Sequence, residues 1–468
     1  MQPIYHSLEA LFNDLPLKDG LNISFHHHLR NGDATQNLIL SYLRKQQLND
    51  LNLYPSAIFP VHTELLTLLK EGRVKNITTN YINGPVAEFL ASNPLPGQLK
   101  MQTHGGRARA IIKGETSIDI AFIAAPIVDA QGNAAGYDGP SACGSLGYAI
   151  EDSQYAKKTV LITDHRVEKL PQYEIKSKDV DAILCVDSLG NREGIVSGTT
   201  AITKDPVGLK IANNAARLID ELKLVKPGMN FQSGAGGISL KVTDHLREML
   251  RARNVKAGFF SGGITQSHVE MLNEGLVERL YDVQCFDLAA IQSLKTNPSH
   301  IAISASDYAN PDNQNRVIKN LDLVILGATE IDLNFNVNVT TDSYNTIIGG
   351  SGGHSDTATD SFVSLIVTPL FKARTPIIKK RVNTITTRGK NIDILVTERG
   401  IAINPLRLDL LDRLKESQLP IYPIEALLEK AYAYTGIPQE YDLRDQPLGV
   451  VEDRDGQIID TLYTKKRR

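Results

Sequence analysis

Short apolar runs alternate along the chain with longer segments that mix apolar and charged residues. The runs at 118–123, 159–162 and 321–326 are rich in β-branched residues and have the length of strands. Runs of this kind are typical of parallel strands buried on both faces of a sheet. The pattern therefore predicts an α/β fold in which buried parallel strands alternate with helices.

One of the predicted helices spans Thr243–Arg253. Its apolar residues fall on one face of a helix with 3.6 residues per turn, and its charged residues fall on the opposite face. The apolar face holds Leu246, Met249 and Leu250, and the charged face holds Arg247, Glu248 and Arg251.

The order of landmarks repeats at a spacing of about 200 residues, which is the size of a domain and not of a solenoid repeat. The segment 18–23 is echoed by 226–231, Asp119 by Asp322, and 143–147 by 351–355. This repetition predicts two similar domains, 1–222 and 223–468. Because no low-complexity linker separates them, we expect tight packing with a ligand-binding cleft between them.

Composition and charge exclude several classes of function. Fifty Lys plus Arg against 53 Asp plus Glu leave a formal charge of -3, so nucleic acid or an anionic membrane is not an expected partner. The three cysteines are odd in number and widely spaced, which argues against a disulfide framework and fits a reducing cytosol. With neither a signal-peptide pattern nor an apolar run of membrane-spanning length, we expect a cytoplasmic protein.

Glycine gathers in three short clusters, at 233–237, 261–264 and 349–354. Such loops after strands let backbone N–H groups converge on an anion or an oxyanion, although a tight turn is the alternative interpretation. No cluster ends in Gly-Lys-Ser/Thr and none has the full dinucleotide pattern, so nucleotide hydrolysis loses its main support. The candidate binding glycines are Gly234, Gly236, Gly237, Gly262, Gly263, Gly352 and Gly353.

Imidazole and guanidinium groups gather in two further segments, at 25–33 and 104–107. Arginine offers a carboxylate two parallel hydrogen bonds and histidine can also donate, so these segments suggest a ligand with several carboxylates. A metal at 26–28 is disfavoured, because only alternate residues of a strand share a face; histidines satisfied in the core are another alternative. We expect no metal site. The candidate residues are His26, His27, Arg30, His104, Gly105, Gly106 and Arg107.

His354 and Asp356 adjoin the richest glycine cluster, where an imidazole can orient a substrate and a carboxylate can position that imidazole. The alternative role for Asp356 is to cap the helix that follows it. Asn334, Asn336 and Asn338 alternate, so a strand would present all three on one face. That face would either line a cleft or lie exposed to solvent.

These segments together resemble the α subunit of citrate lyase, within the CoA-transferase superfamily, over nearly the whole chain. The segments that carry the resemblance are Phe25-His26-His27 with Arg30 and Gly32-Asp33, His104-Gly105-Gly106-Arg107, Cys143-Gly144-Ser145-Leu146-Gly147-Tyr148-Ala149, Gly236-Gly237 with Ser239-Leu240, Gly262-Gly263-Ile264-Thr265, Asp282-Val283-Gln284, Phe335-Asn336-Val337-Asn338-Val339 and Ser351-Gly352-Gly353-His354 with Asp356-Thr357-Ala358.

The resemblance implies two tandem CoA-transferase-like α/β domains with a cleft between them. It also implies exchange of acetyl for citryl on the thiol of an acyl carrier protein, the first step of citrate cleavage to acetate and oxaloacetate. The expected partners are a lyase β subunit and a γ subunit, the acyl carrier, in an oligomeric complex. No cofactor is expected to bind this chain tightly; it would act on acetyl-CoA or on the carrier's phosphoribosyl-dephospho-CoA arm.

One departure from the wider superfamily concerns the nucleophile. Covalent CoA-transferases carry a glutamate in a Ser-Glu-Asn-Gly-type turn, whereas the corresponding stretch here is Phe260-Ser261-Gly262-Gly263-Ile264. The resemblance therefore implies transfer within a ternary complex. Citrate would be held by the His/Arg segments and the thioester by the glycine loops with Asn336, while His354 and Asp356 are the catalytic candidates.

Three alternatives remain open on the sequence alone. The α subunit of malonate decarboxylase would have the same general fold and a similar carrier. A non-catalytic module that binds acyl or sugar-phosphate ligands would belong to another class, and lacks the support of a DNA-binding basic segment. A stand-alone acyl-CoA transferase would require a covalent glutamate.

Overall fold

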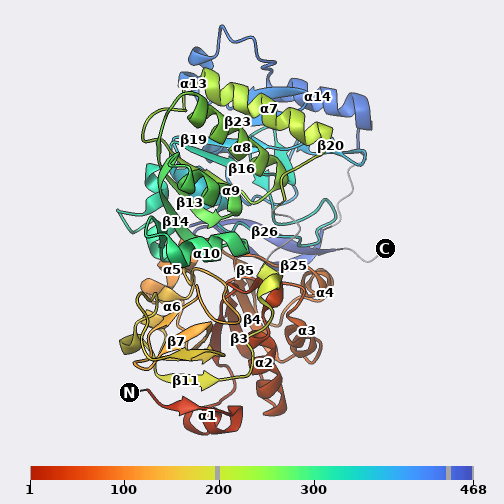
Figure 1. Ribbon diagram of the computed structural model, residues 1–468. Helices are drawn as coiled ribbons and strands as arrows, with labels where there is room; N and C mark the ends of the chain where they lie inside the picture. The colour runs from red at the N-terminus through yellow and green to blue at the C-terminus, as the bar shows by residue number, and fades with distance from the viewer. Residues whose placement is uncertain (1, 196–200, 439–443, 466–468) are drawn as a thin grey trace.

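The structure is a computed structural model that describes residues 2–195, 201–438 and 444–465. Two large, mainly parallel sheets with flanking helices form two halves, stacked one above the other in Figure 1. The predicted α/β fold with two similar halves is confirmed. Side chains of both sheets contribute to a continuous hydrophobic core.

The first sheet has ten strands and occupies the lower half of Figure 1. Across the sheet they are β1 (Ile4–Tyr5), β11 (Ala182–Cys185), β9 (Lys158–Thr163), β6 (Ile120–Ala124), β2 (Asn22–Phe25), β3 (Leu51–Pro55), β4 (Val74–Thr79), β5 (Leu99–Met101), β25 (Arg444–Glu452) and β26 (Ile458–Lys465). The helices of this half are α1 (Leu8–Asp14), α2 (Thr35–Lys45), α3 (Thr63–Lys70), α4 (Pro85–Leu90), α5 (His104–Ile112) and α6 (Ile150–Tyr155).

The second sheet has eight strands, which in order across the sheet are β15 (His300–Ala302), β14 (Val277–Cys285), β13 (Ala257–Ile264), β12 (Asn230–Ser233), β16 (Leu323–Leu326), β19 (Val363–Val367), β23 (Ile394–Thr397) and β24 (Gly400–Ile403). Its helices are α7 (Pro206–Glu221), α8 (Gly237–Ala252), α9 (Gln266–Asn273), α10 (Leu288–Thr296), α11 (Ala305–Ala309), α12 (His354–Asp360), α13 (Leu408–Arg413) and α14 (Ile424–Thr435). Only the last pair of strands, β23 and β24, runs antiparallel.

Three small sheets of the described residues lie outside the two large ones. They comprise β10 (Arg166–Val167), β7 (Ile127–Asp129) and β8 (Ala134–Ala135); β18 (Val337–Asn338), β17 (Glu330–Asp332) and β22 (Ile378–Lys379); and β20 (Phe371–Lys372) with β21 (Thr375–Pro376). The 3-10 turns are η1 (Arg30–Gly32), η2 (Ser177–Asp179), η3 (Arg192–Ile195), η5 (Val317–Asn320) and η6 (Gly389–Asn391).

The three apolar runs that predicted strands coincide with β6, β9 and β16, each within about two residues. The predicted helix at 243–253 is the second part of α8, which begins earlier, at Gly237. Leu246 and Leu250 are buried as expected, while Met249 is half-buried beside them.

The sequence repeat corresponds to repeated hydrogen bonds. Asp119 accepts from the N–H of Asn22 at 3.0 Å in the first half, and Asp322 accepts from the N–H of Asn230 at 2.8 Å in the second. Each aspartate thereby ties the first residue of a central strand, β2 or β12, to the neighbouring β6 or β16 side of its sheet. The same aspartate-to-backbone hydrogen bond thus occurs at equivalent places in both sheets.

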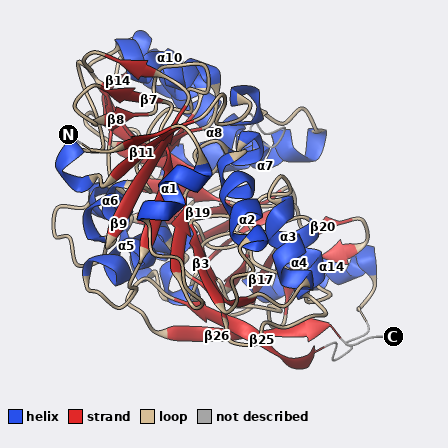
Figure 2. Cartoon of the chain, turned by 90° about the horizontal axis from the view of Figure 1, so that it is seen from below, coloured by secondary structure: helices blue, strands red, loops and turns tan. Residues whose placement is uncertain are grey.

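The last strands of the chain leave the second half and return to the first sheet. Strand β25 pairs in parallel with β5, and β26 pairs with β25 in an antiparallel hairpin, seen along one edge in Figure 2. Residues 444–465 therefore belong to the first sheet, although the division at residue 222 assigned them to the second domain. The position of that division stays a prediction.

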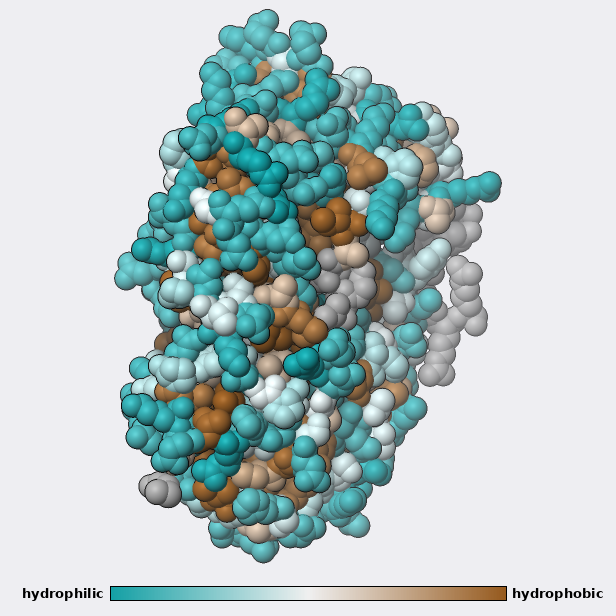
Figure 3. Space-filling view, in the orientation of Figure 1, coloured by the Kyte–Doolittle hydropathy of each residue, from teal (hydrophilic) through white to brown (hydrophobic). Residues whose placement is uncertain are grey.

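Within the described ranges, no helix has the length and hydropathy needed to cross a bilayer. On the face seen in Figure 3, hydrophilic side chains predominate and hydrophobic ones form separate small patches.

Candidate functional site

A cavity of about 600 Å³ lies between the two halves. The first half contributes Tyr81, His104 and Tyr148, and the second half contributes residues at the ends of β12, β13, β14, β16 and β19 or just after them. Ligand sites of open α/β sheets are expected at the carboxyl ends of parallel strands, and these segments lie there. The cavity is thus the predicted cleft between the halves.

The lining of this cavity combines apolar and polar side chains, and the described residues in it carry no charge. Its polar side chains are hydroxyl, amide and imidazole groups, and its described residues include no Asp, Glu, Lys or Arg. An anionic ligand would therefore be stabilised by backbone N–H groups, neutral donors and charges lying behind the lining. A carboxylate nucleophile is absent from the described lining.

The loop between β12 and α8 forms one wall and contains Gly234, Gly236 and Gly237. Gly236 is the N-cap of the 16-residue helix α8 and provides no side-chain cap. The first turn of a helix leaves backbone N–H groups without intrahelical partners and carries partial positive charge. This wall can therefore accept a phosphate or carboxylate oxygen.

The other predicted glycines make room for side chains. A Cβ atom on Gly263 would lie 2.0 Å from the Phe286 ring, and one on Gly262 would lie 2.8 Å from the Gln232 side chain. On Gly353 it would lie 2.5 Å from the hydroxyl of Tyr308.

Gly353 and Gly263 line the cavity, whereas Gly262 and Gly352 are not among the lining residues. Gly352 has a φ of +50°, and a Cβ there would lie 3.2 Å from Nε2 of His104. The predicted anion nests are, at these positions, mainly spaces for neighbouring side chains.

His104 is the member of the predicted His/Arg set that lines the cavity. It begins α5, whose N-cap Thr103 accepts from the N–H of Gly106 at 2.8 Å, and its ring packs on Tyr148 at 4.3 Å between centroids. Burial lowers the pKa of His104 to about 3, so the imidazole is neutral near pH 7. Its Nδ1 is buried without a hydrogen-bond partner among the described residues and is available to a ligand.

His27 and Arg30 lie one layer behind the lining. The His27 ring stacks on Tyr148 at 4.8 Å, and its Nδ1 lies 2.6 Å from Oγ of Ser56. The Arg30 guanidinium lies over the ring of Phe286 at 4.8 Å, and Phe286 itself lines the cavity. Arg30 therefore places a positive charge close to the uncharged lining.

His26 and Arg107 meet instead at a buried carboxylate. Both guanidinium amino groups of Arg107 donate to Asp152, at 2.7 and 2.6 Å, and Nε2 of His26 lies 3.0 Å from the same carboxylate. Burial alone would raise the pKa of Asp152, but Arg107 and then His26 hold it well below its usual range. Neither residue lines the cavity, so the structure does not bring them to the position expected of direct ligand contacts.

His354 lines the cavity, but both of its ring nitrogens have protein partners. Nε2 donates to the carbonyl of Gly327 at 2.9 Å, which leaves Nδ1 to accept from the hydroxyl of Thr387 at 2.8 Å. Burial lowers the pKa of His354 to about 4, so this ring is also neutral. Its orientation is fixed before any ligand binds.

Asp356 lies away from the lining and organises the start of α5. It accepts from the N–H of Gly105 and from the hydroxyl of Thr103, both at 2.9 Å. Gly105 itself permits close packing, because a Cβ there would lie 2.0 Å from the carbonyl of Ala309. Burial raises the pKa of Asp356 to about 7. Asp356 thus caps a helix of the first half, and not the helix that contains it.

Asn336 serves a turn and does not line the cavity. Its Nδ2 donates to Asp332 at 3.1 Å, and its Oδ1 accepts from the N–H of Gly389 at 2.8 Å. The prediction of a strand presenting Asn334, Asn336 and Asn338 on one face was wrong, because β18 begins only at Val337. The alternation arises from a turn built on Asp332, which also accepts from the N–H of Asn334.

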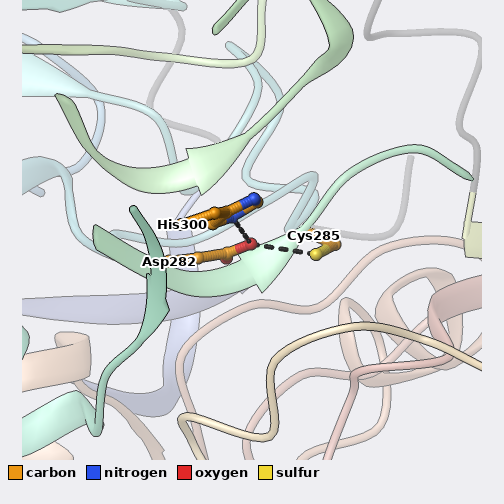
Figure 4. Close-up of side chains that lie close together, drawn as sticks. All are labelled: Asp282, Cys285 and His300. Carbon is orange, nitrogen blue, oxygen red and sulfur yellow. Dashed lines mark hydrogen bonds and ion pairs between the residues drawn. The ribbon is translucent and has the colours of Figure 1, made fainter. Parts of the chain in front are cut away.

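A buried cluster that the sequence analysis did not identify lies beside the cavity wall. Oδ2 of Asp282 is 2.9 Å from both Sγ of Cys285 and Nε2 of His300, and Figure 4 shows the three side chains converging. These distances are hydrogen-bond lengths, whereas donors bound tetrahedrally to one zinc ion lie about 3.4 Å apart. Burial raises the pKa of Cys285 well above its usual value, so the thiol keeps the proton that it donates.

The chain matches known proteins over almost its full length. A sequence model of the family described as citrate lyase, alpha subunit, matches residues 2–465. The citrate lyase alpha chains of Haemophilus influenzae and Escherichia coli are each 41% identical to this chain. The alignments cover 98% of this chain in both cases, and 92% and 90% of the two relatives.

Solved structures give the same result. A Streptococcus mutans structure described as the alpha subunit of citrate lyase in complex with citrate has a TM-score of 0.97 at 42% identity, covering 100% of this chain and 92% of that one. A malonate decarboxylase alpha subunit from Acinetobacter baumannii has a TM-score of 0.66 at 14% identity, covering 90% and 93%, which shows a shared fold alone. On this evidence, the chain belongs to the citrate lyase alpha subunit family.

Proposed function

We propose that this chain is the transferase subunit of a citrate lyase and exchanges acetyl for citryl on a thiol. The observation that carries the proposal is the family match from residue 2 to residue 465. The uncharged, glycine-rich cavity between the halves supports it, since a thioester and a carboxylate can meet there out of bulk water. Under this proposal citrate and either acetyl-CoA or an acetylated carrier arm occupy the cavity together.

The chemistry begins with attack of a citrate carboxylate oxygen on the carbonyl carbon of the acetyl thioester. The thiolate leaves, and a mixed anhydride of acetate and citrate remains. The thiolate then attacks the citryl carbonyl of the anhydride, so acetate leaves and citryl thioester forms. Each step forms one bond to carbon and breaks another, and no net proton transfer is needed.

The enzyme's contribution in this scheme is alignment of the two substrates and stabilisation of negative charge. The start of α8 at Gly236 and Gly237 offers backbone donors to the thioester or to a phosphate of the arm. His104, neutral and with a free Nδ1, offers a hydrogen-bonding group to citrate.

Arg30 is the cation that we assign to citrate. It lies directly behind Phe286, and it adopts a left-handed φ of 50°, a conformation that costs about 1 to 3 kcal/mol for a residue with a Cβ. Strain of this kind clusters at functional sites. Arg107 and His26 act indirectly, by fixing α5 and α6 through Asp152.

The proposal extends to partners and location. A lyase β subunit would cleave the citryl thioester, and a γ subunit, the acyl carrier, would bring its phosphoribosyl-dephospho-CoA arm to the cavity. A tethered arm raises the local concentration of thioester at each active site. A cytoplasmic location also stays a prediction.

The test is transfer by the purified chain from acetyl-CoA to citrate, followed as citryl-CoA by mass spectrometry, with malonate and succinate in parallel. Product that depends on citrate supports the proposal. Product only with malonate would favour the decarboxylase type of transferase, and absence of product with all three acids, even with a carrier protein supplied, would favour a binding role.

A further inference from the structure

Tyr308, at the second half's edge of the cavity, has a hydroxyl held from one side only. Its side chain is 2% exposed and lines the cavity, and its Oη accepts a hydrogen bond from Nε2 of Gln232 at 2.7 Å. Oε1 of Gln232 accepts from Oγ of Ser261 at 3.0 Å, so the two ends of the amide are held by two different hydroxyl groups. Gln232 therefore uses the phenol as an acceptor.

The proton of Tyr308 is left for another group. Across the described ranges, Tyr308 has no hydrogen bond in which its hydroxyl donates to a protein atom. Burial raises the pKa of Tyr308 well above its usual value, so the phenol keeps its proton throughout the neutral range. A fixed donor without a protein acceptor at the edge of a cavity is available to a bound ligand.

Two glycines keep space open around this pair. A Cβ on Gly353 would lie 2.5 Å from Oη of Tyr308, and one on Gly262 would lie 2.8 Å from the Gln232 amide. These residues come from separate segments of the second half, the start of α12 and strand β13. Gly353 and Gly262 thus leave the space that the hydrogen-bonded pair of Tyr308 and Gln232 occupies.

Neighbouring polar groups are less suited to stabilising new charge. Both ring nitrogens of His354 already have protein partners. Tyr148 also lines the cavity, but its ring packs between the imidazoles of His27 and His104, and no hydrogen bond to another described residue fixes its hydroxyl. Preorganised donors are the ones that stabilise a developing oxyanion most effectively.

We propose that Tyr308 donates a hydrogen bond to the oxyanion that forms on the thioester carbonyl, and that Gln232 is its positioning residue. The inference rests on the proposed function. When the citrate carboxylate oxygen bonds to the carbonyl carbon, the C=O π pair moves onto oxygen, and that oxygen accepts from Tyr308. When the C–S bond breaks, the pair returns to re-form C=O and the thiolate carries the electrons of the broken bond.

The experiment compares Tyr308→Phe with the wild-type chain in the acetyl-CoA to citrate assay. The change removes the hydroxyl and keeps the ring, so kcat should fall by about 10²- to 10³-fold, the effect of losing one oxyanion donor. The KM values for citrate and acetyl-CoA should change little, because the bond is made mainly in the transition state. A purely structural role would not produce this separation of kcat from KM.

The matched control is Tyr137→Phe. Tyr137 is also buried, at 6% exposed, and its hydroxyl donates one hydrogen bond, to the carbonyl of Gln172 at 3.1 Å, outside the cavity lining. This variant should keep wild-type kcat.

Gln232→Met provides an independent test that also applies if Tyr308→Phe fails to fold. Loss of the amide should lower kcat less than loss of the phenol, with KM values preserved. The Tyr308→Phe/Gln232→Met double variant should be no slower than Tyr308→Phe, because both changes remove one interaction.

The outcomes separate this inference from the proposed function. A wild-type chain without citrate-dependent transfer would overturn both. An active wild type with unchanged kcat in folded Tyr308→Phe, or with unchanged kcat in Gln232→Met, would overturn the inference alone. A large kcat loss in Tyr148→Phe but not in Tyr308→Phe would move the role to Tyr148.

Discussion

The buried pair of Arg107 and Asp152 offers a sharp stability prediction. Arg107 is 5% exposed and Asp152 is fully buried, and two short hydrogen bonds join them. In Asp152→Asn the guanidinium would remain buried without a countercharge, facing the carbonyls of Tyr54 and Tyr148 at 3.2 and 3.5 Å. Breaking one partner of a buried ion pair costs about 3 to 5 kcal/mol, so the free energy of unfolding should fall by that amount.

The same helix supplies a matched control. Arg109 of α5 also forms two hydrogen bonds with a carboxylate, that of Glu115, both at 2.7 Å, but the Glu115 side chain is 50% exposed. Water reaches the carboxylate of Glu115 and would reach the amide that replaces it, and the carbonyl of Arg454 also accepts from Nε of Arg109 at 3.1 Å. Glu115→Gln should therefore cost no more than about 1 kcal/mol. The contrast isolates burial of the carboxylate, because both arginines are buried and the two pairs have similar geometry.

The assay is urea unfolding followed by circular dichroism at pH 7, with two-state behaviour checked by a second probe. The direction of the pH dependence follows from the lowered pKa of Asp152. The stabilisation that the Asp152 carboxylate contributes is present above the unfolded-state pKa of about 3.9 and is lost as pH falls. The difference between Asp152→Asn and wild type should therefore shrink in acid. Equal losses for Asp152→Asn and Glu115→Gln at pH 7 would refute the reasoning.

Three further predictions concern other parts of the chain. Gly105→Ala places a Cβ 2.0 Å from a backbone carbonyl and should lower the free energy of unfolding by about 1 to 3 kcal/mol. In the control Gly327→Ala the new Cβ meets nothing within 4 Å, so the free energy of unfolding should change by no more than about 0.5 kcal/mol. Equal urea midpoints for the two variants would contradict this prediction. Burial lowers the pKa of His268 to about 4, so the unfolded state binds the proton first and the free energy of unfolding falls as pH drops below about 6.5. His268→Gln, which keeps the capping box with Thr265, should flatten the slope of unfolding free energy against pH by up to about 1.4 kcal/mol per pH unit. An unchanged slope would exclude His268 as the cause. Arg30→Gln removes the positive charge that lies behind Phe286, and at an effective dielectric constant of about 20 such a charge contributes about 1.5 to 3 kcal/mol to binding of an anion. The KM for citrate should therefore rise by roughly 10- to 100-fold, while an equal rise for acetyl-CoA would remove the citrate assignment.

The fold was predictable because its strands are encoded locally. Apolar runs of strand length marked β6, β9 and β16, and the repeat was visible because Asp119 and Asp322 make the same hydrogen bond in each half. Family membership was predictable from motifs spread over the chain, and the comparisons confirm it.

The hairpin of β25 and β26 was not predictable in this way. Its partner, β5, lies more than three hundred residues earlier in the chain, and nothing in a local pattern specifies which sheet edge a terminal strand will join. Pairing of this kind depends on which edge is free in the assembled fold.

The site residues were predicted less well, because a side chain's role depends on what packs against it. Arg107 was a good carboxylate ligand by type, but its carboxylate is Asp152, which lies 45 residues further along the chain. Glycines at 262, 263 and 353 were expected to leave backbone groups open, and instead accommodate Gln232, Phe286 and Tyr308. Tyr308 lies in no motif, so only the folded chain places it at the cavity.

Direct transfer from the thioester to citrate in one cavity, without an enzyme-bound acyl group, is the step on which the proposed function depends. We would measure initial rates over a matrix of citrate and acetyl-CoA concentrations. The chain would also be digested after reaction with acetyl-CoA, and its peptides searched for glutamyl adducts. The described lining holds no carboxylate side chain, so we predict intersecting double-reciprocal lines and no adduct. Parallel lines together with CoA or acetyl attached to a glutamate would contradict the account.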